Sequence, residues 1–510
     1  MRLKYYVLSA AFLLSMGCSE PEDGTPEQGS PDTSVGQQGQ NPGQQGQNPG
    51  QQGQNPGQQA GQNPGQQGQN PGQQGQNPGQ QGQNPGQQGQ NPGQQAGQNP
   101  GSQNSQSNCR PESNPNYPQL VTDEDWARAL VAGTVPADVA FPTIAYSCGF
   151  PVITDDNSVI FIHWYEGESW SVAGDLTNWE TKPMAVGNGI WSAELPMPGD
   201  IASQNTYKFV KNNDAWQSDP WSLRYDYDDN GEISYITKPA NKQHLMRWHD
   251  FKSPQGLKSR SLHVLVPPND GPYDVVYAHD GQNIFQTDGY SGGWRLRENM
   301  STIGGNFLIV GIANTEDRMN EYTHVDDTAF GTFYPTKGNE YAAFVEESVR
   351  PFIESRFQTT AKAGVMGSSL GGLISLYIAH KYPNRYRMVL ALSPTTAWGR
   401  FGSDSGTTIA DLYEQAGHRS TVLYLDNGGN EPQGGCSSFL GIDAANLDES
   451  DGASAVDNMC YTRDFLNRMV NIGYQFDNDL YHWHEPGARH DEKAWAARVF
   501  RPLQIFMGLK

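Results

Sequence analysis

The chain has 510 residues and a formal net charge of -22, from 55 acidic and 33 basic residues. This surplus of negative charge repels phosphate backbones, and no basic stripe offsets it, so we expect no nucleic-acid partner. A single hydrophobic core stops growing well below this length, so we expect two or three domains.

The first 18 residues have the pattern of a secretory signal. Two basic residues precede an apolar run from Tyr5 to Leu14, which is too short to span a bilayer as a mature helix. The end of the segment, Ser15-Met16-Gly17-Cys18, resembles a bacterial lipobox, although Ser15 stands where an aliphatic residue is usual. The resemblance implies a lipid anchor at Cys18 and an extracytoplasmic, outer-membrane or cell-surface location. The alternative is cleavage and free secretion.

Residues 19–108 form a low-complexity segment. From Gly36 to about Gly101 they repeat Gly-Gln-Gln-Gly-Gln-Asn-Pro, which offers no apolar residue to bury. A polar repeat of this short period cannot build a solenoid, so it predicts a disordered linker.

Four cysteines remain beyond Cys18. An even number in an exported chain predicts two disulfides, and the pairs Cys109–Cys148 and Cys436–Cys460 are the simplest of three connectivities. No Cys-x-x-Cys spacing occurs, so we expect no zinc site of that kind. Residues 109–150 form a lead-in segment, with a short helix predicted at 123–131 behind the capping residue Thr122.

Residues 151–245 have the pattern of a small β-sandwich of immunoglobulin size. Short alternating runs near residues 159–164, 190–195 and 206–210 are separated by Gly and Asn/Asp clusters. Segments 172–179, 189–191 and 216–220 resemble the glycogen-binding-type early-set domain, which implies this fold and only weakly implies sugar binding. Six tryptophans lie between Trp164 and Trp221, and core packing is their commoner use.

From residue 246 to 510 the pattern changes to that of a doubly wound α/β sheet. Apolar runs suited to buried parallel strands alternate with helical stretches. Gly367-Ser368-Ser369-Leu370-Gly371 is a Gly-x-Ser-x-Gly motif between a predicted strand and a predicted helix at 370–380. This context makes Ser369 the predicted nucleophile of an α/β-hydrolase fold.

The predicted oxyanion donors lie on two segments. The N–H of Leu370 begins the helix that follows the nucleophile, where the helix dipole is positive. A second N–H is expected from the loop after the strand at 275–278, from Gly281 or Gln282. The alternative is that Asp280-Gly281 only forms a turn.

A general base and an acid are expected downstream of Ser369. His490 lies in a loop between a strand-like run and the predicted final helix at 492–507. For the acid we favour Glu431, just after the strand at 421–425, then Asp426 at the strand tip. The third option is Asp457, which lies beyond an acidic loop but is brought back beside it by the predicted Cys436–Cys460 disulfide.

We expect no cofactor and no metal in this region. His482 and His484 share one face of a strand, but no third ligand is in register with them.

Several segments together resemble the putative-esterase family, which includes enterochelin, feruloyl and acetyl xylan esterases. They are 280–285, 318–322, 350–353, 367–373, 392–394 and the His490 loop. The resemblance covers about residues 262–507 and implies ester hydrolysis through a Ser–acid–His triad and an acyl-enzyme. It leaves open a siderophore ester or a polysaccharide-linked acyl ester as substrate. A non-catalytic, surface-anchored carbohydrate-binding module is the alternative.

Overall fold

The computed structural model describes residues 110–164, 169–198, 205–285, 292–402, 406–432, 436 and 457–509. The predicted signal, the lipid anchor at Cys18, the repeat linker and Cys109 lie outside these ranges. In the described part of the chain, no helix has both the length and the apolar character needed to cross a bilayer.

Two short helices open the described part. Helix α1 (Asp123–Val131) begins where the sequence predicts it, and the side chains of Thr122 and Asp125 form a capping box at its start. Helix α2 (Ala137–Ala145) was not predicted, and Pro136 precedes it with no side-chain cap. Cys148, which follows α2, is disulfide-bonded.

The next region contains two facing sheets. One has the order β1-β2-β6-β5, from strands Val152–Ile153, Ser158–His163, Ile190–Pro196 and Ala185–Gly187. The other contains β3 (Trp170–Gly174), β4 (Lys182–Pro183), β7 (Thr206–Lys211), β8 (Ala215–Gln217), β9 (Arg224–Asp228) and β10 (Gly231–Tyr235). Side chains of both sheets share one apolar cluster, as Phe161 and Phe209 do.

Tryptophans of this region lie in two different environments. Trp170 is buried in the cluster between the sheets, as core packing predicts. Trp179 and Trp216 are exposed, and their rings lie 6.2 Å apart.

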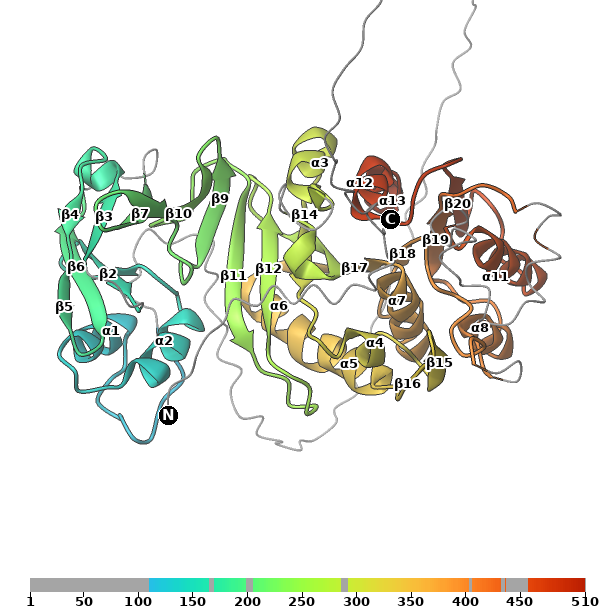
Figure 1. Cartoon of the computed structure of the whole chain (residues 1–510), viewed down its shortest axis with the longest axis horizontal. Coiled ribbons are helices and arrows are strands. Elements are labelled where there is room, and N and C mark those ends of the chain that lie inside the picture. The colour runs from blue at the N-terminus through green and yellow to red at the C-terminus, as the bar shows by residue number, and fades with distance from the viewer. Residues whose placement is uncertain are drawn as a thin grey trace, which may run out of the picture. The chain divides into compact units, whose positions relative to one another are not determined.

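The second sheet continues into the sheet of the carboxy-terminal region, because β9 pairs with β11 (Figure 1). From there the strand order is β11-β12-β14-β13-β17-β18-β19-β20. The strands are His244–Phe251, Arg260–Val266, Phe307–Ile312, Tyr273–His279, Thr359–Ser368, Met388–Leu392, Val422–Asn427 and Leu480–His484. Strand β12 runs antiparallel to both neighbours, and all pairs from β14 to β20 are parallel. This is the strand order of an α/β-hydrolase, and it confirms the predicted doubly wound sheet.

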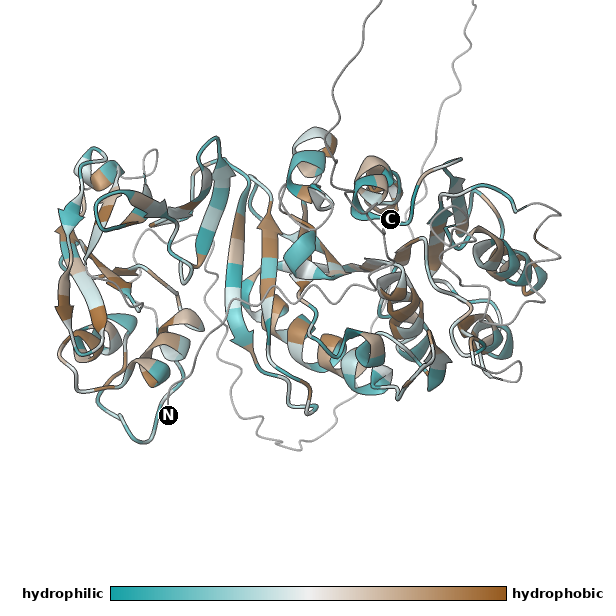
Figure 2. Ribbon diagram, viewed as in Figure 1, coloured by the Kyte–Doolittle hydropathy of each residue, from teal (hydrophilic) through white to brown (hydrophobic). Residues whose placement is uncertain are grey.

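Helices cover both faces of this sheet because successive strand residues are buried on opposite sides. Val275 and Tyr277 belong to one apolar cluster, whereas Val276 and Ala278 belong to another. The first cluster includes α5 (Gly338–Phe344), α6 (Arg350–Arg356), α7 (Leu370–Lys381), α8 (Ile409–Ala416) and α11 (Met459–Asn471). The second includes α3 (Leu296–Ile303), α12 (Glu492–Arg498) and α13 (Phe500–Gly508). Helix α7 is largely apolar, as its brown ribbon in Figure 2 shows.

Shorter elements fill the connections. They are the single-turn helices η2 (Asp175–Thr177) and η3 (Gly281–Asn283), helix α4 (Arg318–Glu321), the hairpin β15 (Asp327–Ala329) and β16 (Thr332–Tyr334), and the π-helical turn η5 (Val345–Val349). The predicted final helix is two helices that meet at Val499. Pro502 has no N–H to donate to the carbonyl of Arg498, so one hydrogen bond of a continuous helix is missing at this point.

Candidate active site

Ser369 occupies the sharp turn between β17 and α7. Its backbone has φ 55° and ψ -123°, a left-handed conformation that non-glycine residues rarely adopt. The N–H of Ser369 donates to the carbonyl of Leu392 at 3.0 Å, which holds the turn. A Cβ on Gly367 would lie 2.5 Å from the backbone of Gly371, so the first glycine of the motif is required by this close approach. The side chain of Ser369 therefore projects from the end of β17, as the motif predicts.

The predicted oxyanion donors lie on segments that approach each other. Leu370 is the first residue of α7, and the turn η3 with Gly281 and Gln282 follows β13 directly. A Cβ placed on Gly371 would lie 3.4 Å from a carboxylate oxygen of Asp280, so the η3 turn lies beside the start of α7. The structure thus brings both candidate sources of backbone N–H groups near Ser369.

An ion pair anchors the η3 turn. Asp280 accepts from Nε and Nη2 of Arg318 at 2.8 and 2.9 Å, and from Nδ2 of Asn314 at 2.6 Å. Burial alone raises the pKa of Asp280, but the charge and hydrogen bonds of Arg318, together with the hydrogen bond from Asn314, bring the pKa below its ordinary value. Sequence reasoning gave Arg318 and Asn314 no separate role, because their partner lies 34 or more residues away.

His490 lies in the loop after β20, and its partner is Asp457. The distance from His490 Nδ1 to Asp457 Oδ1 is 2.5 Å, and Asp457 is fully buried. The His490 ring also lies edge-on to Trp495, with 5.1 Å between centroids. This bond to Nδ1 leaves Nε2 as the nitrogen that can face Ser369.

The Ser369 hydroxyl lies 3.4 Å from Thr395 Oγ1. In the described part of the chain no hydrogen bond joins the Ser369 hydroxyl to His490, and the bond between a nucleophile and its base often forms well only when substrate binds.

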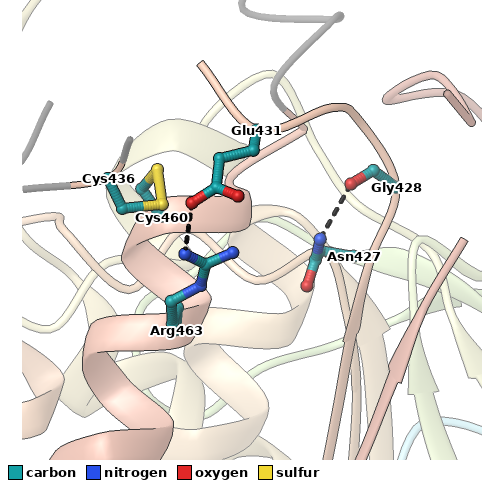
Figure 3. The surroundings of a disulfide bond; sticks show 6 residues. All are labelled: Asn427, Gly428, Glu431, Cys436, Cys460 and Arg463. Carbon is teal, nitrogen blue, oxygen red and sulfur yellow. Dashed lines mark hydrogen bonds and ion pairs between the residues drawn. A yellow bond between two sulfur atoms is a disulfide. The ribbon is translucent and has the colours of Figure 1, made fainter. Parts of the chain in front are cut away.

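The other two predicted acids have different partners, so the structure differs from the sequence ranking. Glu431 forms an exposed ion pair with Arg463 at 2.7 Å, and Figure 3 shows the two side chains pointing toward each other. Asp426 is buried and lies 2.9 Å from Nε of Arg498. Burial raises the pKa of Asp426 to about 6, although Arg498 opposes the rise. Asp457, which the sequence ranked third, is therefore the carboxylate that contacts His490.

The predicted disulfide between Cys436 and Cys460 is present, with Cα atoms 5.1 Å apart (Figure 3). Cys460 lies in the first turn of α11, three residues after Asp457. The bond therefore ties the start of α11 to the segment that follows β19. This disulfide is the signal that made Asp457 a candidate, and it proves more informative than the distance in sequence from β19.

Glu492 connects the His490 loop to the η3 turn. Its Oε1 accepts from Nδ2 of Asn283 at 3.0 Å. Burial raises the pKa of Glu492 to about 7, and the negative charge of Asp280 adds to the rise. This carboxyl is thus held between two segments of the candidate site.

The two histidines of β20 have partners of their own. His482 Nε2 lies 2.9 Å from Asn427 Oδ1, and His484 Nε2 lies 3.0 Å from the carbonyl of Gly429. Among the residues described by the structure, no three His, Cys, Asp or Glu side chains form a group that could hold a metal ion.

Comparison with known proteins gives the same region. Residues 257–504 match the model of a family described as "Putative esterase". The siderophore triacetylfusarinine C esterase of Aspergillus fumigatus is 28% identical over 136 residues, which cover 25% of this chain and 46% of that protein. The ferri-bacillibactin esterase BesA of Bacillus subtilis is 27% identical over 165 residues, which cover 28% of this chain and 56% of that protein. The chain thus spans about half the length of these two curated relatives.

One solved structure extends the comparison to more of the chain. The enterobactin esterase FES from Shigella flexneri, crystallised with 2,3-di-hydroxy-N-benzoyl-glycine, aligns at 14% identity over 69% of this chain and 93% of that chain. The TM-score is 0.37, so the fold assignment rests on the strand order above and not on this alignment. The family match and the sheet with α/β-hydrolase strand order thus fall on the same part of the chain, and residues 257–504 are similar to the putative-esterase family.

Proposed function

We propose that the chain hydrolyses a carboxylic ester through Ser369, His490 and Asp457. The observation that carries this proposal is the 2.5 Å contact between His490 and a fully buried carboxylate, in the loop where the fold requires a base. Asp457 holds the imidazole in one tautomer, with the proton on Nδ1 and the lone pair on Nε2. His490 can then remove the proton of Ser369.

The reaction follows from these roles. The Ser369 oxygen attacks the ester carbonyl while its proton moves to Nε2 of His490, and the alcohol leaves with that proton. Water, deprotonated by His490, then releases the acid from the acyl-enzyme. The backbone N–H of Leu370 and one from Gly281 or Gln282 donate to the oxyanion, where each donor contributes about 10²- to 10³-fold to the rate.

For the substrate we propose a siderophore ester. Two curated relatives carry siderophore-esterase names, and both alignments support this substrate class over a polysaccharide-linked acyl ester. The exposed side chains of Trp179 and Trp216 are the observation that favours a carbohydrate-contacting role for the β region. Carbohydrate binding by the β region is the second candidate function. It would accompany ester hydrolysis or, if Ser369 is inactive, replace it.

We also propose the remaining organisation expected from the sequence. Residues 151–245 form an early-set β-sandwich, residues 246–510 the esterase domain, and Cys18 a lipid anchor that places both outside the cytoplasm at a membrane surface. The two facing sheets with a shared core support the β-sandwich. The disulfide at Cys436 and Cys460 supports an oxidising compartment.

A substrate panel tests the proposed function. The full chain and Ser369→Ala are assayed on a triester siderophore with and without iron, on feruloyl and acetyl esters of xylan fragments, and on short-chain nitrophenyl esters. We expect the highest kcat/KM on the siderophore and a loss of about 10⁴-fold or more in turnover by Ser369→Ala. A clear preference for the xylan esters would overturn the substrate class, and turnover of none of these esters would overturn the function.

A further inference from the structure

Behind Asp457 lies a buried cluster of charges from three different elements. Arg498 at the end of α12, Asp426 near the end of β19, and Asp457 just before α11 have exposed fractions of 1%, 0% and 0%. Arg498 Nε lies 2.9 Å from Asp426 Oδ1, and Arg498 Nη2 lies 3.4 Å from Asp457 Oδ2. The Nε–H does not point along a hydrogen bond, so the first contact is an ion pair alone. One guanidinium thus stands between two carboxylates.

The second oxygen of Asp457 is held by several donors. Asp457 Oδ2 accepts from Ser393 Oγ at 2.7 Å, from the N–H of Gly428, and from Arg498. Three donors on Oδ2 fix the rotation of the carboxylate, so Oδ1 remains directed at His490. Burial of this carboxylate is tolerated because each oxygen has hydrogen-bond partners.

Asp426 and Arg498 also form hydrogen bonds with Ser393, the residue whose hydroxyl donates to Asp457. Ser393 donates its N–H to Asp426 Oδ1 at 3.1 Å, and its hydroxyl oxygen accepts from Arg498 Nη2 at 2.6 Å. Trp495, whose ring lies against His490, donates Nε1–H to the same hydroxyl at 3.1 Å. The buried cluster is therefore connected to the His490–Asp457 pair by hydrogen bonds and a ring contact as well as by charge.

The charges of the cluster have a consequence for His490. Arg498 alone would offset the negative charge of Asp457 and weaken its attraction for the imidazolium. Where Asp426 is ionised, above about pH 6, it offsets Arg498, so the three groups together carry one negative charge. When His490 takes the proton of Ser369, the total of the four charges becomes zero, and a buried site favours such a balance.

We propose that Arg498 and Asp426 are positioning residues of this esterase: Arg498 holds Asp457 in place, and Asp426 offsets the charge of Arg498 so that Asp457 keeps its full attraction for the imidazolium of His490. The inference rests on the proposed triad and goes beyond it, because neither residue touches the reacting atoms. It also gives Asp426, a predicted catalytic acid, a different role.

Other charged groups near His490 stay constant in the test that follows. Arg489 and Asp491 flank His490 in its loop, and the Asp491 side chain accepts from the N–H of Ala494 at the start of α12. Glu492 and the Asp280–Arg318 pair face the loop from the side of the η3 turn. In the described part of the chain, none of them forms a hydrogen bond or an ion pair with Asp426, Asp457 or Arg498.

The experiment measures kcat and kcat/KM against pH for a nitrophenyl ester. The variants are Asp426→Asn, Arg498→Gln and the double variant with both changes. Loss of the Asp426 charge should move the acidic limb of the pH profile lower by up to about one pH unit in Asp426→Asn, and kcat should fall about tenfold. In the double variant Asp457 is the only charged group of the cluster, so the cluster again carries one negative charge. The acidic limb of the pH profile should therefore return to the wild-type position, although kcat stays low. If the two residues had a purely structural role, the double variant would instead show the sum of the two losses in kcat, and the acidic limb would not return to its wild-type position.

Controls separate the outcomes. Asp464→Asn on α11 makes the same chemical change at a side chain that is 44% exposed, and it should leave the limb in place. If Arg498→Gln does not fold, Asp426→Asn alone decides, and an unmoved limb in that variant overturns the proposal. If the wild type hydrolyses no ester, the proposed function fails. The imidazole pKa of His490, measured by NMR in the same variants, then still tests the positioning role by the same shift and return.

Discussion

Replacement of Asp457 by Asn is the change that separates the structural account most sharply from the sequence ranking. The substitution removes a negative charge that lies against His490 at 2.5 Å and keeps the size of the side chain. A carboxylate and an imidazolium with charges about 4 Å apart attract each other by ~4 kcal/mol at an effective dielectric constant of ~20. At 1.36 kcal/mol per tenfold change, kcat should fall about 10³-fold, and about 10⁴-fold if the imidazole also takes the wrong tautomer.

Stability should change as well. Asp457 Oδ2 accepts from Ser393, Arg498 and the N–H of Gly428, and an amide can place an NH₂ group against these donors. Loss of such bonds costs about 1–3 kcal/mol in the free energy of unfolding. We therefore expect Asp457 both to act as the triad acid and to stabilise the fold.

The assay compares Asp457→Asn with Glu431→Gln in kcat on a nitrophenyl ester and in the free energy of unfolding from urea titration. Glu431 forms an exposed ion pair, so its variant should keep kcat within a few fold and lose at most about 1 kcal/mol. The reasoning is refuted if Asp457→Asn keeps more than a tenth of the wild-type rate while Glu431→Gln loses several orders of magnitude.

Three further predictions concern other parts of the chain. Removal of the disulfide by Cys436→Ser and Cys460→Ser should cost about 3 kcal/mol in the chain-entropy model and lower kcat by loosening Asp457; unchanged urea unfolding would contradict this. Because burial raises the pKa of Glu492 from 4.5 to about 7, the folded state keeps a proton that the unfolded chain loses in this range. The free energy of unfolding should therefore fall as pH rises from about 4.5 to about 7, and Glu492→Gln should flatten the slope. The β region should bind α-glucans weakly at most; strong retention on amylose gel that disappears in Trp179→Ala would show otherwise.

The parts of the site that local sequence determines were predictable. Ser369 lies in a turn whose requirements fall within five residues, and a glycine is needed where Gly367 meets the backbone of Gly371. His490 lies between a strand and a helix that both show in the apolar pattern. The buried parallel strands were predictable in the same way, since they have near-continuous apolar runs, whereas their order in the sheet comes from the structure.

The acid was not predictable by the same reasoning. In an α/β-hydrolase fold the triad acid is expected in the loop after β19. Glu431 and Asp426 are near the end of that strand in sequence, whereas Asp457 lies 30 residues beyond Asn427. What brings Asp457 back is long-range: the bonds to Ser393 and Gly428, and the disulfide three residues away. Contacts between residues so far apart leave no periodic pattern in the sequence.

The central claim is that Ser369 is the nucleophile of an ester hydrolase, and active-site labelling tests it most directly. The full chain is treated with a fluorophosphonate probe, digested and mapped by mass spectrometry, with residual esterase activity followed in parallel. The account predicts one label, on Ser369, with activity lost in proportion, and a folded Ser369→Ala variant that takes no label and has lost about 10⁴-fold or more in turnover. A label on another residue, or a tenth of the wild-type rate in Ser369→Ala, would contradict it.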